Sequence, residues 1–142
     1  MESTVDLSSL KWSVVAACFV FSVVSGAIWF GPKTFFPSWW AAIGKRTDDQ
    51  PAGTPLTWIL LMLTSIVQAI CSAIVIPILA NTMGGTNVMT GATAGLLLWF
   101  GFVGSTGLAN KLFAGYLKAW AIESGNHLLN FVVFGAIVGA LR

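Results

Sequence analysis

Residues 56–79 read LTWILLMLTSIVQAICSAIVIPIL and contain no charged side chain. A helix that crosses the hydrocarbon core of a bilayer needs about 20 consecutive apolar residues, which this stretch supplies. Residues 12–30, 88–108 and 117–141 are also long and mostly apolar. Because lipid offers no partner to free backbone groups, all four stretches are expected to be helices. The sequence therefore predicts an all-α membrane protein, with four transmembrane helices in a single domain covering residues 1–142.

The composition of the whole chain agrees with this prediction. Of its 142 residues, 56% are hydrophobic and only 8% are charged, and the mean hydropathy is +0.84. Soluble domains carry about 25% charged residues, so a soluble globular protein is excluded. Disorder is excluded because it needs low hydrophobicity and high net charge. The net charge of +2 without a basic block provides no electrostatic footprint for nucleic acid, so the expected partner is the lipid bilayer.

The connection between the first and second spans is the longest of the three. Aromatic residues from Phe35 to Trp40 are followed there by the basic residues Lys45 and Arg46. Aromatic and then basic side chains are typical of a short helix that lies in the headgroup region of a membrane. We therefore expect a short interfacial helix between the first and second transmembrane helices, followed by a loop rich in proline and glycine.

The distribution of lysine and arginine predicts an orientation. The first and third connections carry five of the seven basic residues, and the opposite side carries two. The positive-inside rule then places connections one and three in the cytoplasm and both termini on the opposite side. The five residues are Lys33, Lys45, Arg46, Lys111 and Lys118, and the two are Lys11 and Arg142.

The two cysteines, Cys18 and Cys71, both lie inside apolar stretches. Two thiols and one histidine, without acidic ligands at a suitable spacing, do not make a tetrahedral zinc site. We expect both cysteines to act as small buried hydrophobic residues, and we expect no metal and no cofactor.

The fourth span contains a cluster of polar residues: Glu123, Asn126, His127 and Asn130. Residues at i, i+4 and i+7 share one helical face, which groups Glu123 with His127 and Asn130, while Asn126 broadens the stripe. At 1.5 Å per residue, His127 lies about 15 Å from the start of the span, near the middle of the membrane. Gln68 lies at a similar depth in the second span, so we expect a hydrogen bond between Gln68 and His127.

Three interpretations of this cluster remain open. In the first, Glu123, His127 and Gln68 form a network that holds helices together, at about 0.6–2 kcal/mol per hydrogen bond. In the second, the fourth helix starts late, so that Glu123 lies at the headgroup level and only His127 is inside. In the third, the cluster is a functional site for a proton, an ion or a lipid-like ligand, because ionisable groups are costly in a membrane. Histidine, with a reference pKa of about 6.5, suits proton transfer, and a Glu–His pair suits acid–base chemistry.

Glycines spaced four residues apart predict close approach between helices. Gly91 and Gly95 form such a pair in the third span, and Gly135 and Gly139 form another in the fourth. Gly101 continues the small-residue face of the third span. These positions are expected either to pack helices within one bundle or to join copies in a homo-oligomer.

Several motifs resemble a known family when they are taken in order. The first span ends GAIWFGP at residues 26–32, and two tryptophans follow at residues 39–40. The third span is followed by NKLF at residues 110–113, and the fourth opens LKAWAIESGNHL at residues 117–128. Over nearly the whole chain, this pattern resembles the domain-of-unknown-function 1761 family of small four-helix membrane proteins. The resemblance implies a retained first helix and a continuous fourth helix from about Leu117, and it implies no activity.

These observations support three hypotheses about function. The first is a non-enzymatic, homo-oligomeric membrane protein that moves a proton, an ion or a small solute. The second is a small membrane enzyme acting on a lipid or isoprenoid-like substrate, with Glu123 and His127 as acid and base. The third is an accessory subunit of a larger membrane complex. We prefer a non-enzymatic protein because the sequence contains no nucleophile with an obvious positioned base. A roomy apolar cavity beside the polar stripe would favour the second hypothesis, and a stripe satisfied by neighbouring helices would favour the third.

Overall fold

The structure, a computed structural model, describes residues 7–141, and every regular element within them is helical. A short 3-10 turn, Leu7–Ser9, precedes the first long helix, and α2 (Phe36–Ala42) lies between the first and second long helices. The predicted fold class is therefore confirmed. The four helical segments that are long and apolar enough to cross a membrane are α1 (Trp12–Trp29), α3 (Pro55–Thr82), the segment Val88–Leu112, and α6 (Leu117–Ala140).

The third of these segments is not one uniform α-helix. It consists of α4 (Val88–Leu98), the π-helical segment η2 (Trp99–Gly104) and α5 (Ser105–Leu112). The Ser105 hydroxyl donates a hydrogen bond of 2.7 Å to the Gly101 carbonyl inside η2. Single π-helical turns within α-helices are rare and occur frequently at functional sites. The sequence predicted a single helix here, so the π-helical segment is a new feature.

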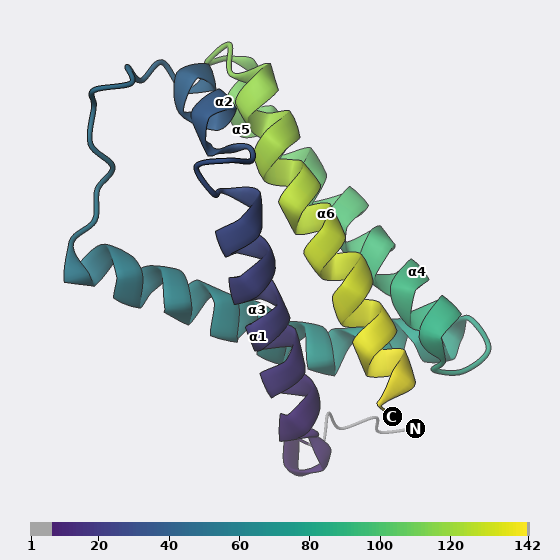
Figure 1. Cartoon of the computed structure of the whole chain (residues 1–142). Coiled ribbons are helices and arrows are strands. Elements are labelled where there is room, and N and C mark those ends of the chain that lie inside the picture. Colours follow the sequence, from purple (N-terminus) through teal and green to yellow (C-terminus); the bar gives the residue numbers. More distant parts are fainter. Residues whose placement is uncertain (1–6, 142) are drawn as a thin grey trace.

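The closest packing in the molecule joins α4 to α6, which run antiparallel (Figure 1). A Cβ atom added to Gly91 would overlap the backbone carbonyl of Gly135, and one added to Gly95 would overlap that of Phe131. Gly139 lies equally close to the backbone at the start of α4. The two glycine pairs therefore face each other within a single chain, and only a hydrogen atom fits between the two backbones.

α3 takes a different course from the other long helices. It begins at Pro55, after Thr54, whose side chain accepts a hydrogen bond of 3.3 Å from the backbone N–H of Thr57. It then runs across α1 and α6 rather than alongside them (Figure 1). The middle and C-terminal turns of α3 reach the core, where Ile76 is fully buried. The N-terminal turns leave the bundle, and large side chains such as Trp58 are exposed there.

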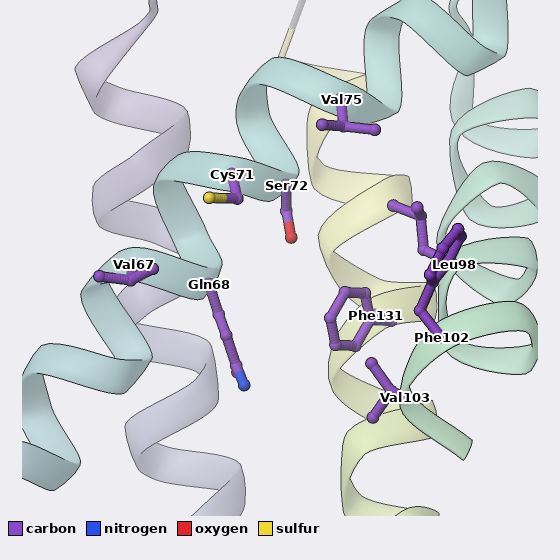
Figure 2. A pocket seen from close by; sticks show the side chains of 9 residues that line it. All are labelled: Val67, Gln68, Cys71, Ser72, Val75, Leu98, Phe102, Val103 and Phe131. Carbon is purple, nitrogen blue, oxygen red and sulfur yellow. The ribbon is translucent and has the colours of Figure 1, made fainter. Parts of the chain in front are cut away.

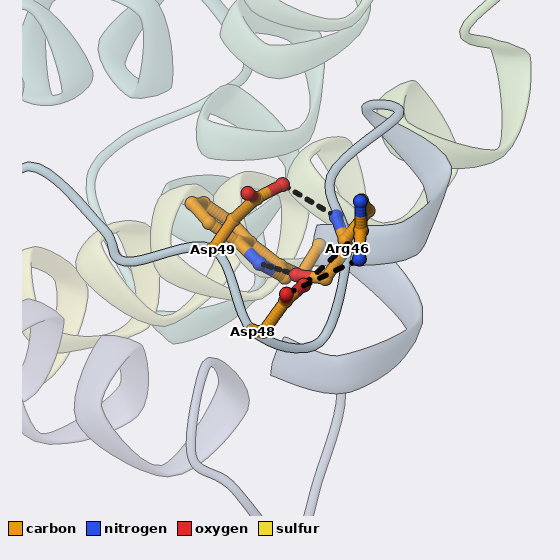
Figure 3. Close-up of polar contacts among 4 residues, drawn as sticks. Arg46, Asp48 and Asp49 are labelled. Carbon is orange, nitrogen blue, oxygen red and sulfur yellow. Dashed lines mark hydrogen bonds and ion pairs between the residues drawn. The ribbon is translucent and has the colours of Figure 1, made fainter.

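The two ends of the helix bundle are held by different contacts. At one end, Lys11 before α1 donates a hydrogen bond of 3.2 Å to the Leu141 carbonyl after α6. At the other end, α2 lies near the connection between α5 and α6 (Figure 1). The turn after α2 is held by Arg46, whose backbone N–H donates to Asp49 at 2.7 Å and whose guanidinium pairs with Asp48 at 3.2 Å (Figure 3). Arg142, counted in the charge distribution, lies outside the described residues.

Candidate functional site

Glu123 lies near the start of α6, where α2 and α5 contact that helix. Its Oε1 atom accepts a hydrogen bond of 2.8 Å from the Trp39 indole of α2 and one of 3.2 Å from the Lys111 ammonium of α5. The side chains of Glu123 and Lys111 are each 27% exposed. A carboxylate in an apolar span is tolerated when it has a partner, and this one has both a cation and a neutral donor. Glu123 therefore joins three helices.

Asn126 and Asn130 face the first helix. The Asn126 amide donates to the Ser25 hydroxyl at 3.4 Å, and this hydroxyl donates to the Asn130 side-chain oxygen at 2.5 Å. The Asn130 amide in turn lies 3.5 Å from the Asn126 side-chain oxygen. Both asparagines are buried, so their polar groups need such partners. These contacts connect α1 to α6 by a closed set of side-chain hydrogen bonds.

The expected hydrogen bond between Gln68 and His127 is absent from the described part of the chain. His127 Nδ1 is buried without any hydrogen-bond partner among residues 7–141, and so is Ser124 Oγ. The oblique course of α3 explains the difference. The sequence places Gln68 and His127 at similar positions along their own helices, but α3 diverges from α6 instead of running parallel to it (Figure 1).

Tryptophan side chains supply contacts that the sequence analysis missed. Four indole N–H groups connect the first half of α6 to the elements around it, each at an ordinary hydrogen-bond distance. An indole N–H inside an apolar span needs an acceptor, and this requirement is the signal that points to these residues. The bonds run from Trp29 to the Ile122 carbonyl (2.9 Å), from Trp39 to Glu123 (2.8 Å), from Trp99 to the Ser124 carbonyl (3.0 Å) and from Trp120 to the Gly104 carbonyl (2.9 Å).

Two of these bonds hold the π-helical segment η2 against α6. Trp99 at the start of η2 donates to α6, and Trp120 of α6 donates back to Gly104 at the end of η2. Gly101, in the middle of η2, has no atom within 4 Å of the position that a Cβ would occupy. Gly101 therefore does not pack helices within this chain, whereas the four other glycines lie between α4 and α6.

A cavity of about 240 Å³ lies between α3, the α4–η2 segment and α6 (Figure 2). Most of its wall is apolar, and several lining side chains are also exposed on the outside of the bundle, so the cavity opens sideways. If the helices cross a bilayer, this opening faces lipid. The lining residues are Val67, Gln68, Cys71, Ser72, Val75, Leu98, Phe102, Val103 and Phe131.

Two polar side chains of α3 point into this cavity. Figure 2 shows the Ser72 hydroxyl and the Gln68 carboxamide directed toward the space in front of Phe131. Ser72 is only 2% exposed. Neither side chain has a hydrogen-bond partner in the part of the chain that the structure describes. Cys71 also lines the cavity and is an exposed free thiol, contrary to the expectation that both cysteines are buried, which holds for Cys18.

The profile of a family of proteins of unknown function, the domain-of-unknown-function 1761 family, matches residues 13–139. The chain belongs to this family. No curated protein and no solved structure matches it. As the resemblance implied, α6 of this family member is continuous from Leu117.

The motifs that carry the family resemblance meet in space in this member of the domain-of-unknown-function 1761 family. The segment at residues 26–32 contributes Trp29, and the segment at residues 110–113 contributes Lys111. Both contact the segment at residues 117–128. Within residues 7–141, no three His, Cys, Asp or Glu side chains gather into a set that could hold a metal ion. The arrangement can therefore position helices tightly and present one apolar cavity with a few polar groups.

Proposed function

We propose that this integral membrane protein binds the hydrocarbon chain of a lipid-like molecule in the cavity between α3, η2 and α6. The observation that carries the proposal is the cavity itself, which has a largely apolar wall and opens toward the outside of an apolar helix bundle. Its volume of about 240 Å³ is below the range of roughly 300–1,000 Å³ for drug-sized sites. A single chain therefore suits it better than a whole phospholipid.

The contacts of Glu123 favour binding over acid–base catalysis. An acid–base mechanism needs Glu123 and His127 to act on the same substrate, but Glu123 Oε1 accepts from Trp39 and Lys111 and makes no hydrogen bond to His127. The carboxylate thus helps to position α2 and α5 against α6. The cavity, by contrast, presents only neutral groups to a ligand.

The polar stripe also argues against a path for protons or ions between copies of the chain. Asn126 and Asn130 are buried and bonded to Ser25 inside one chain. The glycine pairs that could have joined two copies are occupied by the contact between α4 and α6. The binding proposal therefore concerns a single chain and requires neither a homo-oligomer nor a larger complex.

Photolabelling tests the proposal. The protein in lipid nanodiscs would be illuminated with a hexadecane-type probe that carries a diazirine, with and without excess unlabelled probe, and the labelled peptides identified by mass spectrometry. We expect labelling of residues 67–75 and 98–103 that saturates and is competed by unlabelled probe. Val75→Trp, which fills the cavity, should reduce this labelling several-fold. Ile59→Trp, on an exposed turn of α3 outside the cavity, serves as the matched control. Labelling that never saturates, or that is equal in both variants, would overturn the proposal.

For the orientation in the membrane, we propose that the end of the bundle with α2 and the α5–α6 connection faces the cytoplasm. The support is the group of basic residues in these two connections and the positive-inside rule. Labelling of a cysteine placed at Lys33 with a membrane-impermeant maleimide tests this, with a cysteine at Gly84 in the opposite turn as the control. Labelling of the first from the outside of intact cells would reverse the orientation.

A further inference from the structure

The Ser72 hydroxyl, which lines the cavity, lacks the hydrogen bond that most helical hydroxyls make. Hydroxyl groups inside apolar helices usually donate to a backbone carbonyl three or four residues earlier. Ser22 and Ser65 do so in this chain, at 2.8 Å and 3.2 Å. Ser72 is only 2% exposed, yet its hydroxyl has no such partner within residues 7–141. Because a buried polar group without a partner is costly where lipid excludes water, this hydroxyl calls for a partner from outside the chain.

Gln68 supplies a second hydrogen-bond donor beside Ser72. The two residues are four positions apart on α3, so their side chains are neighbours on one face of the helix, with Cβ atoms about 5–6 Å apart. Both residues line the cavity, and Figure 2 shows the Ser72 oxygen and the Gln68 amide nitrogen directed into it. Since a hydrogen bond spans about 3 Å, both groups can donate to one oxygen atom that lies between them.

The ligand group that meets these donors has to be uncharged and rich in lone pairs. No charged residue lines the cavity, and an uncompensated charge within a membrane span is costly. A hydroxyl group would add a proton that needs an acceptor of its own. A carbonyl oxygen has two lone pairs and no proton, so it can accept from Ser72 and Gln68 together without adding an unpaired donor.

We propose that the cavity binds a hydrocarbon chain with an uncharged carbonyl group, such as a fatty acyl ester or a long-chain ketone, whose oxygen accepts hydrogen bonds from Ser72 and Gln68. The inference rests on the proposed function, because the hydrocarbon part of the ligand would pack against the apolar wall, which includes Val75 and Phe131. Water is the other neutral molecule that these two donors can bind. The experiment must therefore separate a bound carbonyl from bound water.

The test measures competition for the cavity labelling by the hexadecane-type diazirine probe. The unlabelled competitors share one chain and differ in the head: hexadecane, methyl hexadecanoate, methyl hexadecyl ether, hexadecanol and hexadecanoate. The ether resembles the ester but lacks its carbonyl oxygen. In wild-type protein we expect the ester to compete about tenfold better than hexadecane, which corresponds to the net gain from the hydrogen bonds to its carbonyl. The ether, the alcohol and the carboxylate should each compete less well than the ester.

The outcomes distinguish this inference from the proposed function. Equal competition by the ester and hexadecane would leave the proposed function standing and overturn the inference, with water as the partner of Ser72. An ether, alcohol or carboxylate that competes as well as the ester would also overturn it, because the carbonyl would not be the recognised group. Absence of saturable labelling in any of these experiments would refute both proposals.

Variants of α3 test the assignment of the two donors. Ser72→Ala and Gln68→Leu should each reduce the advantage of the ester over hexadecane, while the saturable labelling by the probe itself persists and shows that the cavity is intact. Ser65→Ala is the matched control, because the Ser65 hydroxyl lies on the same helix and donates to the Leu61 carbonyl. An ester preference that survives both Ser72→Ala and Gln68→Leu would refute the assignment.

Infrared spectroscopy of the bound ester gives a readout that does not depend on photolabelling. Hydrogen bonding lowers the stretching frequency of a carbonyl group, and an isotope label at the carbonyl carbon separates its band from those of the protein and the lipid. We expect the band at a lower frequency with wild-type protein and Ser65→Ala than with the double variant Ser72→Ala, Gln68→Leu. The same frequency in wild-type protein and in the double variant would show that these residues do not bind the carbonyl.

Discussion

Replacing Gly95 by alanine tests the contact between α4 and α6 most directly. The added Cβ would overlap the backbone carbonyl of Phe131, and because backbone cannot rotate away like a side chain, the two helices must separate. Overpacking of this kind costs about 1–3 kcal/mol of unfolding free energy. For a chain of this size, each kcal/mol lowers the melting temperature by roughly 2–4 °C.

In the control variant, the change from glycine to alanine is not expected to lower the stability. Gly26 lies inside α1, and nothing lies within 4 Å of the position of its Cβ. Alanine is favoured over glycine within a helix by about 0.5–1 kcal/mol, so Gly26→Ala should be neutral or stabilising. Unfolding in mixed micelles with increasing dodecyl sulfate, followed by circular dichroism, measures both variants. If Gly95→Ala is as stable as Gly26→Ala, the two backbones are not in contact and the packing argument fails.

Two further predictions concern the side-chain bonds of α6. Trp99→Phe should lower the free energy of unfolding by about 1 kcal/mol, because the hydrogen bond from the indole to the Ser124 carbonyl disappears. Trp58→Phe should leave the stability unchanged, since Trp58 is exposed. Equal melting temperatures for the two variants would contradict this prediction. Lys111→Met should destabilise the protein by removing the cationic partner of Glu123. Adding Glu123→Gln should restore part of the lost stability, because glutamine can still accept the hydrogen bond from Trp39. A double variant that is less stable than Lys111→Met would show that the charge pair is not the cause.

Much of the fold could be predicted from the sequence because the apolar stretches are long and the membrane permits few alternatives. The short helix before α3 follows from such a local pattern, whereas the start of α6 near Leu117 was implied by the family resemblance. The π-helical segment could not be predicted in this way, because Trp99 and Trp120 hold it from both ends through contacts with another helix. The course of α3 also depends on its packing, since the helix contains no charged residue and its few polar side chains do not specify which neighbouring helix it meets.

The candidate site was predicted in part. The sequence identified the polar residues of α6, and the structure places Asn126 and Asn130 together, but their partner is Ser25 of α1 rather than a residue of α3. Residue spacing defines which side chains share a face of one helix, but it does not determine which neighbouring helix meets that face. For the same reason, the glycine pairs indicated a close contact without indicating whether it lies within one chain or between two.

The bond between Ser25 and Asn130 has a consequence for the synthesis of the protein. These residues are separated by 105 positions. At about 5–20 residues per second, the ribosome needs roughly 5–20 s to proceed from the first to the second. During that interval α1 is already made, and the Ser25 hydroxyl can donate only to the Ser22 carbonyl of its own helix, which lies 3.2 Å away, because Asn130 does not yet exist. The bundle can therefore close only after its last helix has entered the membrane, and the newly made first helix must wait for it.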